Sequence, residues 1–171
     1  MDRDQDRSPN PVDLHVGARI RMRRKILGNA HRNVAASLQA LGGLLGDKGN
    51  LEEAEAMYRE ALAIIIKALG HEHSEVSLTL NNLALVLRDE RKLDEAEPMF
   101  REALALRRKI FGNESAAVMV TLNNLGLLLT DKARLDEAES LFREALALSR
   151  EKHSGRLADV QYAEPAGRQP A

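Results

Sequence analysis

Two asparagine pairs recur at one position of an internal repeat, and they are the residues in this chain best suited to polar recognition. Asn81 and Asn82 lie 42 residues before Asn123 and Asn124. Asparagine is unfavourable inside a helix because its side chain competes for backbone hydrogen bonds, so two pairs in predicted helices need a reason. The amides either face a ligand or bond neighbouring repeats to each other. Both roles can hold together.

No pattern of a catalytic or metal site accompanies these amides. The sequence has no cysteine, and His71 and His73 have no third ligand nearby in sequence, which argues against a metal centre. It contains no GxSxG or HExxH motif, and no paired carboxylates beyond the acidic helix starts described below. We therefore expect a protein that is not an enzyme and needs no cofactor.

The asparagines belong to a repeat of 42 residues that organises most of the chain. Residues 79–108 match residues 121–150 at 21 of 30 positions, and residues 37–70 form a weaker copy. Aromatic residues make up only 3% of the chain, whereas leucine and alanine recur throughout, which is typical of helical proteins. Self-similarity at this period indicates an all-α solenoid, in which each unit packs only against its neighbours.

Each unit divides into two predicted helices joined by a short polar turn. Leucines at i, i+3 and i+7 place the first helices at about 32–46, 75–89 and 117–131. The second helices begin with acidic clusters, end near basic residues and stop at Gly70 and Gly112, as the helix macrodipole and glycine caps favour. Asn50 and Glu53 have the spacing of a capping box.

These signals divide the chain into a lead-in, a repeat domain and a tail. The repeats are predicted at 31–70, 73–112 and 115–152, and a basic helix at 12–28 has the register of a preceding half repeat. Residues 1–11 form a predicted disordered lead-in, and residues 153–171 form a mostly disordered tail. The open end after Arg150 must be covered by the tail or by a second copy, so a homo-oligomer through the exposed end helices is one expectation.

Four positions in every unit resemble the tetratricopeptide repeat. A small residue precedes an alanine by twelve positions, and an aromatic residue and a second alanine follow that alanine after four and seven. These sets are Gly42, Ala54, Tyr58, Ala61; Ala84, Ala96, Phe100, Ala103; and Gly126, Ala138, Phe142, Ala145. The period of 42 and the TLNNL openings resemble the kinesin-light-chain variety of that family. The resemblance implies a right-handed superhelix of antiparallel helix pairs, with three full repeats and one preceding helix.

The resemblance also implies a protein–protein interaction scaffold whose first helices line a concave groove. In such repeats, polar residues near the middle of the first helices contact an extended peptide. The matching positions, followed by the next residues along the same face, are Gln39, Asn81, Asn82, Asn123 and Asn124, then Leu85, Arg88 and Leu127. The leucines have the alternative role of core residues. The predicted partner is a peptide or protein, whose identity the sequence does not indicate.

Residues 8–28 suggest a second interpretation. They resemble the first helix of a Cro/cI-type helix-turn-helix regulator, so the alternative function is a transcriptional regulator with these repeats, or a fragment of one with a truncated DNA-binding head. No recognition helix follows, and the formal net charge is -1, which argues against binding to nucleic acid. The sequence has no apolar run that could span a membrane and no signal peptide. We expect a cytoplasmic protein.

Overall fold

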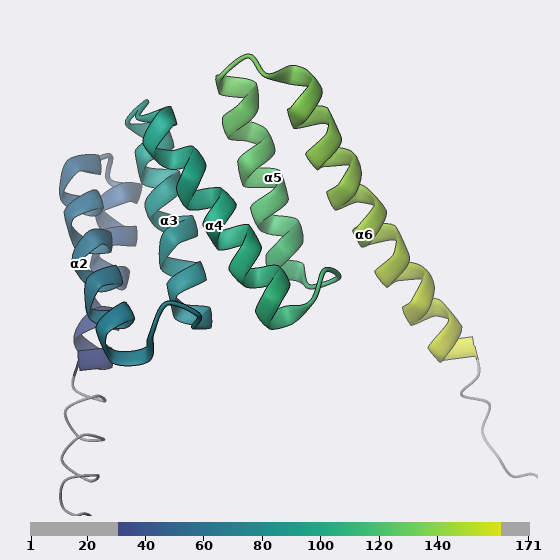
Figure 1. Cartoon of the computed structure of the whole chain (residues 1–171), viewed down its shortest axis with the longest axis horizontal. Coiled ribbons are helices and arrows are strands. Elements are labelled where there is room, and N and C mark those ends of the chain that lie inside the picture. The colour runs from purple at the N-terminus through teal and green to yellow at the C-terminus, as the bar shows by residue number, and fades with distance from the viewer. Residues whose placement is uncertain (1–30, 162–171) are drawn as a thin grey trace, which may run out of the picture.

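The chain folds into a stack of antiparallel helices (Figure 1). The computed structural model describes residues 31–161, with side chains for residues 31–151. Within this range six helices follow one another: residues 31–47, α2 (Leu51–Leu69), α3 (Ser74–Asp89), α4 (Leu93–Phe111), α5 (Ala116–Asp131) and α6 (Leu135–Gln161). The predicted all-α superhelix of helix pairs is confirmed. The predicted lead-in at 1–11 and half repeat at 12–28 lie outside the described residues.

Residues with positive φ close the turns at equivalent repeat positions. Gly70 and Gly112 follow α2 and α4 with φ of 84° and 78°, a conformation that favours glycine, so both predicted stops are confirmed. The turn inside each repeat also uses positive φ, at Gly49, Arg91 and Ala133. Only the first of these three is a glycine, so Arg91 and Ala133 hold a backbone conformation that is uncommon for other residues.

The predicted capping box at the start of α2 is wrong. Asn50 is the N-cap residue, but its side chain makes no capping hydrogen bond, because its ψ of 66° is far from the extended conformation that aims a cap at the first free amides. Side chains do cap α3 and α5, where His73 accepts from the Glu75 amide and Ser115 from the Val118 amide. The α2 start relies instead on its acidic first turn.

Small residues let the two helices of a pair approach closely. Gly42 lies against the ring of Tyr58, and Gly126 lies against Phe142, so near that a Cβ at residue 126 would fall 2.6 Å from Phe142 Cε1. Glycine at this position therefore leaves room for the aromatic ring of the following helix. The core continues along the stack between the two layers of helices.

The first helices of the repeats form the inner layer of the curved stack. The backbones of α3 and α5 approach each other closely, whereas those of α2, α4 and α6 do not in the described part of the chain. Equivalent elements approach most closely on the inside of a curved solenoid. The inner layer therefore consists of the helix at residues 31–47, α3 and α5. The faces of these helices that point away from the second helices line the inner curve of the stack.

The last helix is longer than its counterparts. α6 continues to Gln161, whereas the sequence predicted that the third repeat would end near residue 152 and that a mostly disordered tail would follow. Arg156, Leu157 and Ala158 are good helix formers, and the first proline after α6 is Pro165, so no strong signal stops the helix earlier. Residues 162–171 of that predicted tail lie outside the described range. None of the described helices is both long and apolar enough to cross a bilayer.

Candidate functional site

The inner faces of α3 and α5 present asparagines flanked by apolar side chains. On both helices a residue of the asparagine pair lies four positions after one apolar residue and three before another. We call this set the inner stripe: Leu78, Asn82 and Leu85 on α3, and Val120, Asn124 and Leu127 on α5. Leu78, Val120 and Leu127 are exposed, and the other three are half-buried.

A chain of side-chain amides crosses the junction between the second and third repeats. Asn124 Nδ2 donates to Asn81 Oδ1 at 3.2 Å, and Asn81 Nδ2 donates to Asn82 Oδ1 at 3.4 Å. Asn81 is only 4% exposed, whereas Asn123 at the equivalent position of α5 is exposed. Asn81 therefore bridges the two repeats, and Asn82 and Asn124 bring the amide chain to the surface.

Asn82 and Asn124 use only part of their hydrogen-bonding capacity. A primary amide offers two N–H donors and two acceptor lone pairs. Among the side-chain hydrogen bonds of the described residues, Asn124 makes one as a donor and Asn82 makes one as an acceptor. The Tyr58 hydroxyl lies within hydrogen-bonding reach of the Asn82 side chain, and burial is the largest reason that the pKa of this hydroxyl is raised. The remaining amide groups are suited to a peptide backbone.

Two other predicted site residues contact the following repeat. Gln39 Nε2 donates to Thr79 Oγ1 at 2.5 Å, and Arg88 Nε donates to Asp131 Oδ2 at 2.6 Å. Both side chains are half-buried. The structure thus brings Asn81, Asn82 and Asn124 together, while Gln39 and Arg88 each bond the following repeat within the inner layer.

Leu78 and Val120 were not predicted as site residues from the sequence. These residues are 45% and 50% exposed, and each lies four residues before the surface asparagine of its helix. Side chains at i and i+4 share one face of a helix. The 42-residue spacing of the pair and its position next to the asparagines were the available signal.

Ion pairs join successive second helices with the same 42-residue period; we call this set the outer ladder. Glu55 accepts hydrogen bonds from Arg59 of its own helix and from Lys92 of the next repeat, at 2.5 and 2.6 Å. One repeat later, Glu97 accepts from Arg101 and Arg134, each at 2.8 Å. The bond from Lys92 is the main reason that the pKa of Glu55 is lowered to about 2.

The pKa of Glu97 is set by the same two opposing effects, burial and hydrogen bonding. Burial alone would raise the pKa of its carboxyl group, but hydrogen bonds from Lys132, Arg101 and Arg134 outweigh burial and lower the pKa to about 2. The outer ladder therefore stabilises the ionised form of Glu97 in the folded chain.

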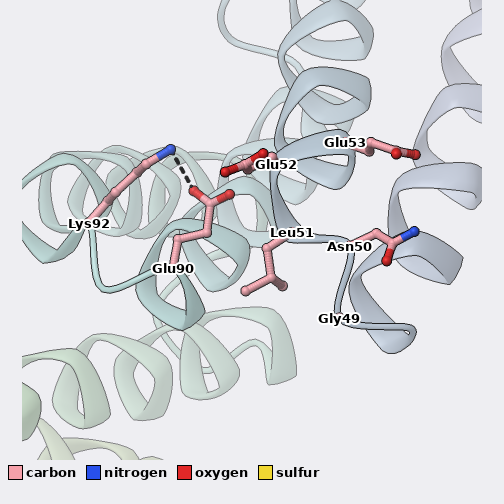
Figure 2. Close-up of a pocket in the computed structure, with 7 residues that line it drawn as sticks. All are labelled: Gly49, Asn50, Leu51, Glu52, Glu53, Glu90 and Lys92. Carbon is pink, nitrogen blue, oxygen red and sulfur yellow. Dashed lines mark ion pairs between the residues drawn. The ribbon is translucent and has the colours of Figure 1, made fainter.

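A cleft of about 520 Å³ lies between the first and second repeats (Figure 2). The ion pairs beside it differ from those at the next junction. It is lined by Gly49, Asn50, Leu51, Glu52, Glu53, Glu90 and Lys92. The Glu90 side chain is 6% exposed, and Lys92 Nζ lies 2.8 Å from its Oε2, but neither oxygen accepts a well-aligned hydrogen bond in the described chain. At the next junction the equivalent residue is Lys132, which bonds Asp94 and Glu97 at 2.7 Å each.

Comparison with protein families identifies the repeats. Tetratricopeptide repeat family models match residues 34–75 and residues 75–151, which together make up more than two thirds of the chain. The matched range begins inside the helix at residues 31–47 and ends on α6.

Solved structures with a similar fold include kinesin light chain repeats. The kinesin light chain TPR-like repeats of Podosopora anserina align with a TM-score of 0.61 and 17% identity over 86% of this chain and 80% of theirs. A variant form of those repeats aligns with a TM-score of 0.63 and 20% identity, over 70% of this chain and 57% of that one. BtubC (BKLC) from P. vanneervenii gives 0.60 and 23% identity, over 80% of this chain and 68% of BtubC. At these identities the likeness supports the fold alone.

A short match connects the chain with regulators. Uncharacterized HTH-type transcriptional regulators of Sinorhizobium medicae (strain WSM419) and Rhizobium meliloti (strain 1021) are each 50% identical to it over 32 residues. Those residues make up 19% of this chain and 23% of each regulator. The match therefore spans about a quarter of the length of these curated relatives.

Proposed function

Because this chain belongs to the tetratricopeptide repeat family, we propose that it binds an extended peptide of a partner protein along the inner faces of α3 and α5. Repeats of this family are in general protein–protein interaction scaffolds. The observation that carries the proposal for this chain is the inner stripe, in which two partly unsatisfied amides stand between exposed apolar side chains.

The inner stripe matches the chemistry of an extended peptide. A peptide backbone offers one N–H and one C=O per residue, which pair with the remaining groups of Asn82 and Asn124. Leu78 and Leu85 on α3, with Val120 and Leu127 on α5, flank these amides and would contact apolar side chains of the peptide. Each backbone hydrogen bond contributes about 1 kcal/mol, and burial of a leucine side chain about 2 kcal/mol.

The binding role of Asn82 and Asn124 is tested against the junction role of Asn81, which is hydrogen-bonded to both of them. Linear peptides selected from a displayed library on the full chain serve as probes. Asn82→Ala combined with Asn124→Ala should weaken the selected peptides roughly tenfold to thirtyfold, since two hydrogen bonds of about 1 kcal/mol each are lost. Asn81→Ala should lower the free energy of unfolding without a comparable loss of affinity, because Asn81 is buried in the junction.

The matched control for the double variant is Lys67→Ala with Glu102→Ala, which changes two exposed residues of the outer layer on α2 and α4. Affinity is read by isothermal titration calorimetry, and retained helicity by circular dichroism. If the Asn82 and Asn124 double variant binds the selected peptides as tightly as this control does, the groove assignment fails.

The second candidate function is regulation of transcription through DNA. It is favoured by the 50% identity over 32 residues with HTH-type regulators. The predicted basic helix within residues 8–28 lies outside the described residues. Titration of the full chain with duplex DNA tests this function: affinity must fall steeply as salt concentration rises, and must drop on replacement of Arg23 and Arg24 by Glu. Absence of salt-dependent binding removes it.

A further inference from the structure

The helix at residues 31–47, the first in the described part of the chain, exposes positions that are buried in the later repeats. Val34 is 50% exposed, whereas the equivalent Val76 and Val118 are fully buried. Leu41 and Leu44 are exposed in the same way, although their counterparts in α3 and α5 belong to the core. A cleft of about 340 Å³ lies on this face and is lined by Asn33, Val34, Ser37, Leu38 and Leu41. The face has the composition of one half of a repeat junction.

The opposite end of the stack exposes the other half of such a junction. Leu146 on α6 is 50% exposed, whereas Leu104 at the equivalent position of α4 is 7% exposed. Phe142 is half-buried, although Phe100 one repeat earlier is fully buried. These two α6 residues line a cleft of about 310 Å³ with Thr130, Leu135, Ala138, Glu139 and Arg143.

Two further series of ion pairs between successive second helices end at α6. Arg59 pairs with Glu95 of the following repeat at 3.0 Å, and Arg101 pairs with Glu137 at 3.6 Å. The next residue in this series is Arg143, whose ion pair in the described chain is with Glu139 of its own helix. Arg108 likewise pairs with Glu144 of the following repeat, and Arg150 is the residue one repeat after Arg108.

The first repeat carries charges that would extend three of the ion-pair series between repeats, although Asn50 stands where Lys92 and Arg134 donate to Glu55 and Glu97. Glu53 is the counterpart of Glu95 and Glu137, the acidic partners of the ladder arginines, and Glu60 is the counterpart of Glu144. Lys48 is the counterpart of Lys132, which bonds Asp94 and Glu97. All three first-repeat residues are exposed. The corresponding α6 pair, one repeat after Asp94 and Glu97, is Asp136 and Glu139.

We propose that the first repeat of a second copy of this chain docks on α6, in the place that a fourth repeat would occupy. In this arrangement Glu53 of the second copy pairs with Arg143, its Glu60 with Arg150, and its Lys48 with Asp136 and Glu139. The apolar face of its first helix covers Phe142 and Leu146. The two halves of a junction meet with matched apolar residues and opposite charges.

Such an interface is heterologous, because it joins the first-repeat face of one copy to the α6 face of another. A bound pair of copies therefore still has one of each face free. Copies therefore add head to tail, and their inner stripes align into one longer surface. This assembly goes beyond peptide binding by a single chain and does not depend on it. It also addresses the marginal stability of a solenoid with few repeats, because each copy covers the open ends of its neighbours.

A charge exchange between the two ends tests the assembly on the full chain. The weight-average mass of the wild-type protein, measured by sedimentation equilibrium at low ionic strength, should rise with concentration beyond that of a dimer. Arg143→Glu and Glu53→Lys should each raise the dissociation constant at least about tenfold, because each places like charges opposite one another. The double variant carries both exchanged charges and should recover most of the wild-type affinity.

The matched control is Glu102→Lys, which reverses an exposed charge on α4 away from both ends. Its mass should follow that of the wild-type protein, and circular dichroism should show equal helicity for all variants. A wild-type chain that stays monomeric at every concentration overturns the proposal. An effect of Arg143→Glu without any effect of Glu53→Lys also overturns it, because association would then use α6 alone. Failure of the double variant to recover affinity does the same.

Discussion

One charge is reversed between the two junctions of the described repeats. Lys132 bonds Asp94 and Glu97 at the second junction, whereas Glu90 occupies the equivalent position at the first. The ammonium near Glu90 is that of Lys92 (Figure 2). Lys92 also donates to Glu55, and the Glu90 oxygens accept no well-aligned hydrogen bond in the described chain. Burial of a carboxylate without full hydrogen bonding destabilises the folded state.

Glu90→Lys should therefore stabilise the chain. The new ammonium would have Glu52 and Glu55 as partners, which are the counterparts of Asp94 and Glu97 one repeat earlier. We expect the free energy of unfolding to rise by about 1 kcal/mol, measured by urea denaturation at neutral pH. Glu102→Lys makes the same change of charge at an exposed site and should alter the free energy much less. A less stable Glu90→Lys chain would show that the Glu90 carboxylate is better accommodated than its contacts indicate.

The sequence indicated the asparagine positions of the candidate site but not which member of each pair faces solvent. Asn81 and Asn123 have the same residue type and repeat position, yet the first is buried and the second is exposed. The difference arises because Asn81 lies at the junction with α5, where Asn124 bonds it. Coverage by a neighbouring repeat is a property of the stack. For the same reason, the bonds of Gln39 to Thr79 and of Arg88 to Asp131 were not foreseen.

At the scale of helices, local signals predicted the extents of the elements well. The leucine period placed α3 and α5 within one residue of their ends, and the glycines at 70 and 112 marked the ends of α2 and α4. The capping box failed because the spacing of Asn50 and Glu53 carries no information on the ψ angle of the cap. The length of α6 was underestimated because loss of the repeat pattern does not itself stop a helix.

The ion pairs of the outer ladder, which join successive second helices, should stabilise the chain less in acid. The pKa of Glu97 is about 2 in the folded chain, below the ordinary glutamate value of 4.5. A lowered pKa adds stability that is complete above about pH 4.5 and is lost as the pH falls towards 2. We expect Glu97→Gln to reduce the free energy of unfolding at pH 7 by about 1 kcal/mol after solvent screening, and to flatten its decline below pH 4.5.

Urea denaturation at a series of pH values between 7 and 3 measures this effect, with Glu102→Gln as the control. Glu102 is exposed on the same helix, and no side-chain hydrogen bond or ion pair of Glu102 is found among the described residues. The control should follow the wild-type pH dependence. Parallel curves for Glu97→Gln and the wild-type chain would show that Glu97 titrates alike in the folded and unfolded states.

At the scale of the molecule, the stack is held together by contacts between neighbours. Each described helix from α2 to α6 packs on the next in sequence, and the one further close approach of backbones among them joins α3 to α5. The 42-residue period predicted this one-dimensional order. It did not predict the curvature, which depends on how closely the first helices approach one another. In such a stack the stability of a repeat depends on how many of its faces are covered.

Equivalent aromatic residues test that dependence. Phe100 of the second repeat is fully buried between its neighbours, whereas Phe142 of the third repeat is half-buried against Gly126. Phe100→Ala should lower the free energy of unfolding by about 4 kcal/mol, and Phe142→Ala by roughly half as much, because less apolar surface is withdrawn from water there. Urea denaturation of both variants at concentrations where the chain is monomeric measures the difference. Equal losses would mean that the third repeat is as firmly held as the second, and that the open face of α6 is not a weak point that an added copy would strengthen.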